Sequence, residues 1–156
     1  MIPCVRAYQL NDKQAVLQLL ALNTPKYFDP SEATGFANYL DNEAERYFVA
    51  EQDGNIVGCG GYNTQTTDGA DVRICWDIIH PDYQGKGYAR KLMDFVEDMA
   101  RTKVATSVRL DTFSRNKRNQ KFYEQRGYHR LDDIYFPLQS DHPFHCYELV
   151  IEFATS

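Results

Sequence analysis

The chain lacks the features that mark membrane and secreted proteins. No segment approaches the roughly 18 consecutive apolar residues of a membrane-spanning helix, so we expect none. The first residues, Met1–Arg6, show no charged start followed by an apolar stretch, so we expect no secretory signal. Positive charge is not in excess either. The formal net charge is −5 at pH 7, which argues against a protein that attracts nucleic acid through its phosphates.

The chain also lacks closely spaced cysteines, which argues against two further classes of protein. The chain has no Cys-x-x-Cys pair and no histidine at ligand spacing from a cysteine within a strand-like run, so we expect neither a disulfide framework nor a bound metal. The one local cluster, His142–Cys146, fits a loop that leads into a strand better than a zinc site. Free thiols of this kind favour the reducing cytoplasm. The four residues concerned are Cys4, Cys59, Cys75 and Cys146.

The remaining composition is that of one soluble enzyme domain. Apolar residues make up 43% and charged residues 25% of the 156-residue chain, which are ordinary values for a globular protein. We find no internal repeat, low-complexity tract or linker in the sequence. A chain of this length can bury a sizeable core, so we expect a single domain over residues 1–156.

The most informative segment is residues 78–92. An apolar strand ends at Pro81, passes through a glycine-rich turn and enters an amphipathic helix. The turn reads Gln84-x-x-Gly87-x-Ala89, which is neither the P-loop pattern nor the dinucleotide-binding fingerprint. Unpaired backbone N–H groups and the helix dipole make such a turn a phosphate-binding site. Positive charge surrounds it on Lys86, Arg90 and Lys91.

A second block lies downstream, after a predicted strand over residues 108–112. It begins at Asn116, places Tyr123 seven residues later and ends with Gly127-Tyr128. Together the two blocks resemble the GCN5-related N-acetyltransferases (the GNAT family). Their acetyl-CoA pyrophosphate loop reads Arg/Gln-x-x-Gly-x-Gly/Ala, and a later segment reads Asn-x-x-Ala-x-x-x-Tyr…Gly-Phe. Asn119 replaces the family's usual alanine, and Tyr128 its phenylalanine.

The resemblance implies an α/β fold in three layers. Its central sheet is mixed and mostly antiparallel, with about seven strands, and about four helices cover both faces. The pattern of elements agrees with that order, since two helix starts at residues 11–14 and 29–32 follow a short first strand. Asp53-Gly54 predicts a hairpin turn. The expected strands are residues 4–8, 47–50, 56–59, 70–79, 108–112, 128–134 and 146–153.

The resemblance also implies where acetyl-CoA, the expected co-substrate, is held. The thioester arm of the family's cofactor lies beside the fourth strand, which places that contact at Ile79 with His80 at the exit of the strand. Asn116 would bond the pantetheine arm, and Lys86 or Lys117 would lie near the ribose phosphate. The implied contacts are Ile78, Ile79, His80, Gln84, Gly85, Lys86, Gly87, Tyr88, Ala89, Arg90, Asn116 and Tyr123.

Acetyl transfer needs a group that protonates the departing thiolate and a route for the proton of the amine. The resemblance makes Tyr123 the candidate general acid, the alternative being an aromatic residue that packs on the sheet. Asp77 and Asp111 are the candidate general bases. The alternatives are a water chain with no dedicated base, or structural ion pairs of these carboxylates with Arg73 or Arg109. Period-two alternation predicts Ala70, Val72, Ile74, Trp76 and Ile78 on one face of the strand and Asp71, Arg73, Cys75 and Asp77 on the other.

The predicted function is therefore acetylation of a primary amine, on a small molecule or a peptide, by direct attack in a ternary complex. A covalent route through Cys75 is disfavoured, because no histidine is visibly placed to activate that thiol. The sequence does not name the acceptor, although many aromatic residues could line a pocket for it. Two alternatives stay open: an inactive acyl-CoA sensor of the same fold, and an interaction domain that forms homodimers through a sheet edge near Cys146–Phe153.

Overall fold

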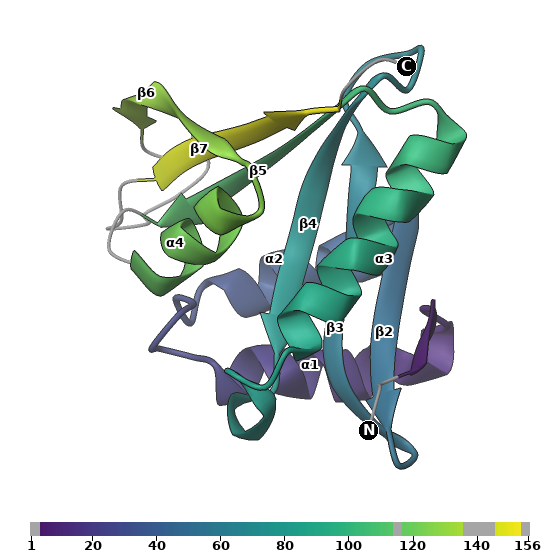
Figure 1. The fold of residues 1–156 in the computed structure, drawn as a ribbon. Coiled ribbons are helices and arrows are strands. Elements are labelled where there is room, and N and C mark those ends of the chain that lie inside the picture. Colours follow the sequence, from purple (N-terminus) through teal and green to yellow (C-terminus); the bar gives the residue numbers. More distant parts are fainter. Residues whose placement is uncertain (1–3, 114–116, 136–145, 154–156) are drawn as a thin grey trace.

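The structure is a computed structural model, and it describes residues 4–113, 117–135 and 146–153. Within these ranges the chain forms seven strands and four α-helices (Figure 1). The strands are β1 (Cys4–Ala7), β2 (Arg46–Gln52), β3 (Asn55–Thr64), β4 (Asp71–Ile79), β5 (Ser107–Phe113), β6 (His129–Tyr135) and β7 (Cys146–Glu152). The α-helices are α1 (Lys13–Leu22), α2 (Glu32–Asn38), α3 (Tyr88–Lys103) and α4 (Lys117–Gln125). Three short helical turns, Leu10–Asp12, Tyr39–Glu43 and Pro81–Tyr83, complete them.

The strands form one sheet in the order β1-β2-β3-β4-β5-β7-β6. Every neighbouring pair is antiparallel except β4 and β5, which run parallel. This pair is bonded only over Asp71–Arg73 and Ser107–Arg109. Beyond those residues the two strands diverge toward the carboxyl end of β4 (Figure 1). The sheet is therefore open in its middle, between β4 and β5.

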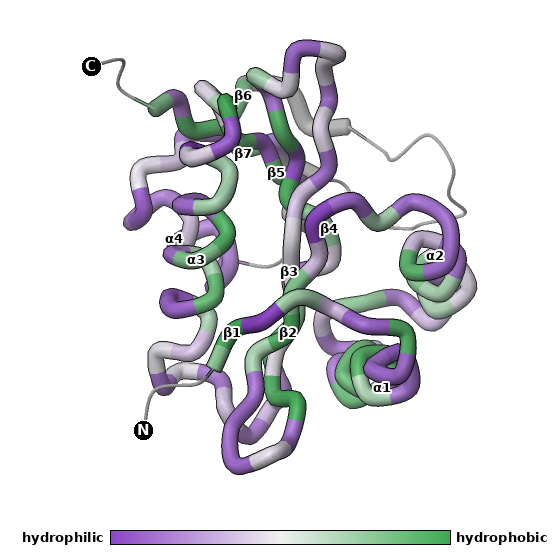
Figure 2. The backbone as a smooth tube through the Cα atoms, turned by 90° about the vertical axis from the view of Figure 1, so that its right-hand side faces the viewer, coloured by the Kyte–Doolittle hydropathy of each residue, from purple (hydrophilic) through white to green (hydrophobic). Residues whose placement is uncertain are grey.

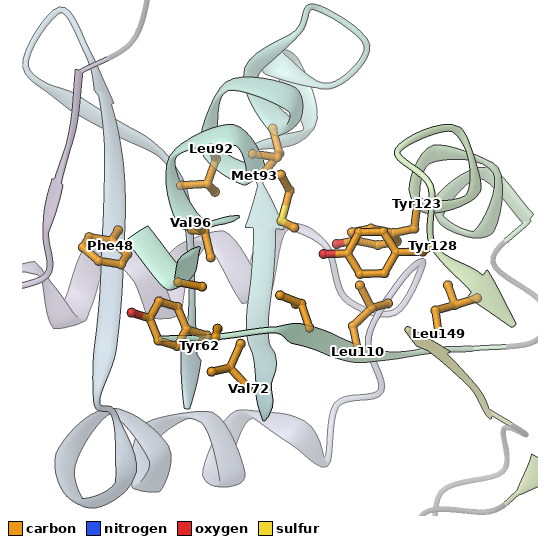
Figure 3. Packing of buried hydrophobic residues seen from close by; sticks show 14 residues of the cluster. Phe48, Tyr62, Val72, Leu92, Met93, Val96, Leu110, Tyr123, Tyr128 and Leu149 are labelled. Atoms are coloured by element: carbon orange, nitrogen blue, oxygen red, sulfur yellow. The ribbon is translucent and has the colours of Figure 1, made fainter. Parts of the chain in front are cut away.

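Helices cover both faces of the sheet, as the sequence predicts. Figure 2 shows α1 and α2 on one face and α3 and α4 on the other. Val16, Leu20 and Phe36 fill the core under α1 and α2. Leu92 and Val96 of α3 fill the second core. Figure 3 shows this second core, in which the side chains of α3 meet those of the sheet and of Tyr123 and Tyr128. The expected three-layer α/β fold is confirmed.

β4 carries a bulge that the sequence pattern does not predict. Trp76 and Asp77 of β4 together face the single residue Gly60 of β3, between two regular stretches of the ladder. Trp76 adopts a φ of +48°, in the left-handed region that bulky residues rarely visit. The hydroxyl of Tyr47 donates a hydrogen bond to the Trp76 carbonyl oxygen at 2.7 Å, which stabilises this conformation.

The bulge overturns the predicted alternation of side chains along β4. Cys75 and Trp76 both pack into the core under α1 and α2, whereas Ile74 packs against the core under α3. The Asp77 side chain points to this second face, where it meets Tyr123. The prediction that Asp77 shares a face with Cys75 is wrong, because one extra residue shifts the two-residue period of a strand by one position.

Two smaller predictions also need correction. The edge near Cys146–Phe153, suggested for a homodimer, is not an edge, because β7 is bonded to β5 on one side and to β6 on the other. The edges among the described strands are β1 and β6. The helix start expected at residues 11–14, with Asn11 as its cap, is also different. Asn11 lies within a 3₁₀ turn, in which Asp12 accepts from the Gln9 backbone N–H at 2.8 Å. No helix within the described ranges is long and apolar enough to cross a membrane.

Candidate active site

A cavity of about 750 Å³ lies where β4 and β5 diverge. Its walls come from both faces of the sheet: the segment between α1 and α2 on one face, and α3 and α4 on the other. β4 contributes Arg73–Ile79 to the lining of the cavity, and β5 contributes Leu110–Thr112. The cavity therefore reaches from one face of the sheet to the other, through the sheet itself.

One wall is the glycine-rich turn before α3. Gly85 and Gly87 have φ values of +75° and +90°, which residues with a Cβ rarely adopt. Gly87 is the N-cap of α3 and provides no side-chain cap. The first N–H groups of α3 thus lack intrahelical partners, and they carry the positive end of the helix dipole. This turn can bind an anionic group such as a pyrophosphate.

Two guanidinium groups lie close to the same turn. A Cβ built on Gly85 would lie 3.1 Å from an Nη atom of Arg118, and one on Gly87 would lie 3.9 Å from an Nη atom of Arg90. Arg90 follows the turn directly, whereas Arg118 reaches it from α4. Sequence reasoning missed Arg118, because only the packing of α4 beside α3 brings it to the turn.

A polar cluster fixes the end of β4 against α1. The carbonyl oxygen of Ile79 accepts from the amide of Gln84 at 2.9 Å and from the amide of Asn23 at 3.1 Å. Gln84 also donates to the side-chain oxygen of Asn23 at 2.9 Å. Asn23 is buried at the C-terminus of α1, and all three residues line the cavity. Gln84, the first residue of the loop motif, thus orients the strand end. Asn23 was missed because nothing in a single sequence pairs it with a loop 61 residues away.

Asp77 and Tyr123 meet at the centre of the cavity. The hydroxyl of Tyr123 donates to Oδ2 of Asp77 at 2.5 Å. Burial raises the pKa of Asp77 to about 6, although the Tyr123 hydrogen bond and the charge of Arg126 oppose this shift. Burial, and then the negative charge of Asp77, raise the pKa of Tyr123 well above 10. At neutral pH the pair is therefore an ionised carboxylate and a protonated phenol.

Two residues that line this cavity each have a buried oxygen atom without a hydrogen-bond partner. The two atoms are Oδ1 of Asp77 and Oγ1 of Thr112. Buried polar atoms usually find partners, so such atoms indicate where a ligand or a water binds. Oδ1 of Asp77 leaves this carboxylate free to accept a second hydrogen bond, in addition to the one from Tyr123. Thr112 was not singled out from the sequence, which offers no signal for it.

Asp111, the other candidate base, lies in a charged ladder across β4, β5 and β7. Its Oδ2 is 2.8 Å from Nη1 of Arg73, and Nη2 of Arg73 is 3.1 Å from Oε1 of Glu148. Arg109 bridges Asp71 at 2.7 Å and Glu148 at 3.1 Å. Asp111 lines the cavity, but its side chain is 39% exposed and forms an ion pair with Arg73.

The structure groups most of the residues that the sequence singles out. The cavity is lined by the predicted cofactor contacts Ile78, Ile79, Gln84, Gly85, Gly87, Ala89, Arg90 and Tyr123. Three others do not line it. His80 accepts from the Asp82 backbone N–H at 3.0 Å, Tyr88 donates to Gln52 at 3.3 Å, and the Lys86 ammonium lies 5.9 Å from the ring centroid of Tyr83. Asn116 lies outside the described residues.

Cys4, Cys59 and Cys75 are free thiols. Burial raises the pKa of Cys75 to about 11 and that of Cys59 to about 12, so both thiols are neutral at physiological pH. No group of histidine, cysteine or acidic residues that could hold a metal occurs in the parts of the chain that the structure describes.

Comparison with known proteins agrees with this geometry. The profile of the Acetyltransferase (GNAT) family matches residues 14–128. An acetyltransferase of Yersinia pestis is 30% identical over 97 residues, covering 61% of this chain and 65% of its own length. An uncharacterised N-acetyltransferase of Mycobacterium bovis is 33% identical over 93 residues, covering 60% of this chain and 58% of its own length. The aligned part thus spans less than two thirds of either curated relative.

Solved structures share the fold over nearly the whole chain. Ard1 from Thermoplasma volcanium superimposes with a TM-score of 0.83, at 17% identity, over 99% of this chain and 100% of its own. The structure of yncA from Salmonella typhimurium, determined with its cofactor acetyl-CoA, gives a TM-score of 0.76 at 16% identity, over 100% of this chain and 96% of its own. Identities this low show a shared fold.

Proposed function

Since the chain belongs to the GNAT family of acetyltransferases, we propose that it transfers an acetyl group from acetyl-CoA to a primary amine. The observation that carries this proposal is the Asp77–Tyr123 pair, which lies in a cavity bounded by an anion-binding helix start. An ionised carboxylate and a protonated phenol in contact can accept one proton and donate another. Acyl transfer to an amine needs both.

The residues present fit acetyl-CoA. The turn at Gly85 and Gly87, with Arg90 and Arg118 beside it, suits the pyrophosphate. Asp77 and Thr112 add polar side chains to the lining of the cavity. When bound, the thioester supplies an activated acyl group that the amine can attack directly.

We assign the proton transfers to the two paired side chains. The Asp77 carboxylate accepts the proton that the amine loses as it attacks the carbonyl carbon. The hydroxyl of Tyr123 gives its proton to the departing sulfur. Asp77 then returns a proton to Tyr123 through their 2.5 Å hydrogen bond, which restores the pair for the next cycle. Asp111 is the weaker candidate for the base, because Arg73 pairs with it.

Direct transfer is favoured over a covalent acyl-enzyme. Cys75 lines the cavity, but with a pKa of about 11 its thiol is not a thiolate at neutral pH. The Tyr39 hydrogen bond lowers that pKa less than burial raises it. No acyl group therefore needs to pass through the protein, and a ternary complex of acetyl-CoA and amine suffices.

The base assignment predicts a specific pH dependence. Asp77 must be ionised to accept a proton, so kcat/KM should rise with pH through a limb near pH 6. Asp77→Asn should lower kcat/KM about a hundredfold or more and remove that limb. The measurement is the initial rate of thiol release from acetyl-CoA with one amine, from about pH 5 to about pH 8.

Asp111→Asn is the matched control, since it removes a carboxylate from the same cavity and should keep the acidic limb. Loss of the limb in Asp111→Asn alone would assign the base to Asp111.

Tyr123→Phe, which deletes one oxygen, should preserve acetyl-CoA affinity in a calorimetric titration and reduce kcat. Micromolar binding of acetyl-CoA without turnover of any amine would instead indicate an acyl-CoA sensor.

A further inference from the structure

The cavity has a second end, on the face of the sheet that α1 and α2 cover. Aromatic side chains form this end: Tyr27 and Phe28 from the segment after α1, and Trp76 from the bulge in β4. The Phe28 and Trp76 rings are stacked: their centroids lie 6.4 Å apart and their planes are inclined by 21°. The Phe36 ring also stacks on Trp76, with a distance of 4.7 Å between the ring centroids and an angle of 26° between the planes. We refer to Phe28, Phe36 and Trp76 as the aromatic shelf.

The bulge is what presents Trp76 at this end. A regular strand would direct Trp76 to the α3 face and Asp77 to the α1 face. The extra residue reverses both, so the indole lies on the α1 face and the carboxylate on the α3 face. Strained backbone that persists at a cavity is a reason to look for function there, and Trp76 is such a residue.

The charged groups near the shelf are already paired. Arg73 contacts Asp111 and Glu148, and Glu32 accepts from the Asp29 backbone N–H at 2.9 Å. The Cys75 thiol beside Trp76 is neutral, because burial raises its pKa to about 11. A second charged group on the acceptor would have to displace one of these partners, whereas an apolar group would meet aromatic faces directly.

We propose that the acceptor is a primary amine joined through a short carbon chain to a flat apolar ring, which lies on the aromatic shelf. The inference rests on the proposed function and names the class of its substrate. The ring stacks on Trp76 and Phe28 in the offset manner that aromatic pairs prefer. The amine nitrogen reaches through the opening between β4 and β5 toward the Asp77 carboxylate, which takes up its proton.

Trp76 provides a direct test, because it is the only tryptophan in the chain. In the wild-type protein with saturating CoA, 2-phenylethylamine should change the tryptophan emission in a saturable way. Ethanolamine, with the same two-carbon amine and no ring, should leave it unchanged. An equal response to both amines, or none to either, overturns the proposal. This readout needs no turnover and no variant.

Turnover provides the second test. The ratio of kcat/KM for 2-phenylethylamine to that for ethanolamine should exceed one in the wild type. Phe28→Ala should lower this ratio about tenfold or more, because a stacked ring loses its partner. Phe153→Ala is the control: it removes a half-buried ring that packs on Arg101, outside the cavity, and should leave the ratio unchanged.

Other acceptor classes give distinct outcomes. A preference for spermidine or for the free N-terminus of a short peptide over 2-phenylethylamine overturns the substrate class and leaves acetyl transfer intact. A protein that binds acetyl-CoA yet releases no thiol with any of these amines contradicts the proposed function itself. The two failures are therefore separate results of one amine panel.

Discussion

At the scale of single residues, Asp77 combines two opposing requirements. Its carboxylate must be ionised to act as a base, yet burial disfavours that charge and raises its pKa to about 6. The folded state thus binds this proton more tightly than the unfolded chain, whose aspartates titrate near pH 4. Folding stability contributed by this group is present below about pH 4 and is lost as the pH rises through 6.

Asp77→Asn should therefore stabilise the protein at neutral pH. Removing the buried charge should raise the free energy of unfolding at pH 7 by at most about 3 kcal/mol, and the gain should disappear near pH 4, where the aspartate is protonated. Urea unfolding at the two pH values measures both quantities. Asp111→Asn is the control, because its exposed carboxylate is paired with Arg73. A gain of the same size at both pH values would contradict this account.

At the scale of elements, α4 contributes to the site beyond its tyrosine. Arg118, one residue into α4, lies over the glycine turn that precedes α3. This contact joins two helices across the cavity mouth and adds a charge where phosphate is expected. Sequence reasoning named Lys86 and Lys117 for that region, but Lys86 lies near the ring of Tyr83 and does not line the cavity.

Arg118→Ala should weaken acetyl-CoA binding about tenfold, because a charge-assisted contact to a phosphate is lost. It should not affect S-acetylpantetheine, which lacks the pyrophosphate. Lys121→Ala, on the same helix but outside the cavity lining, should change neither affinity. Calorimetric titration with both ligands measures the difference. Equal losses for the two ligands would show that Arg118 acts on the fold and not on the phosphate.

Close packing of β2 on β3 makes one glycine essential. A Cβ on Gly61 would lie 2.0 Å from the Arg46 carbonyl oxygen and 2.8 Å from the Tyr47 Cα atom, both of which belong to backbone that cannot yield. Gly61→Ala should reduce the free energy of unfolding by about 4 kcal/mol or prevent folding. Gly35→Ala, in α2 with nothing within 4 Å, should stabilise by about 0.5–1 kcal/mol. Thermal unfolding of both variants tests this; similar melting temperatures would refute it.

At the scale of the whole molecule, local signals predicted the order of elements and half of the site. The glycine turn is contiguous in sequence, so its residues could be named, and the resemblance of the second block to a GNAT segment made Tyr123 a candidate. Features created by packing could not be read this way. The bulge at Trp76 arises from pairing with β3, and Asn23, Thr112 and Arg118 reach the cavity only through long-range contacts.

The helix stripes show the same division. In α1, the spacing of apolar residues predicts a buried stripe of Val16, Leu17, Leu20 and Ala21. Val16 and Leu20 are buried, whereas Ala21 is exposed. Leu19 is buried in its place. Adjacent helix residues point about 100° apart, which predicts that Phe122 and Tyr123 face different surroundings. Their ring centroids nevertheless lie 5.0 Å apart, and both side chains contact the same core. An apolar stripe predicts that a helix packs against the core. The elements that surround the helix decide which residues of the stripe are buried.

The opening between β4 and β5 has a consequence for the order of events in the reaction. The residues that line the cavity come from α3 and α4 and from the segment between α1 and α2. These helices lie on opposite faces of the sheet (Figure 2), so the cavity is bordered by both faces. The nucleotide half of the donor and the body of the acceptor can therefore approach from opposite faces of the sheet. Neither ligand then blocks the approach of the other. Donor and acceptor can therefore bind in either order, and the two products can leave independently.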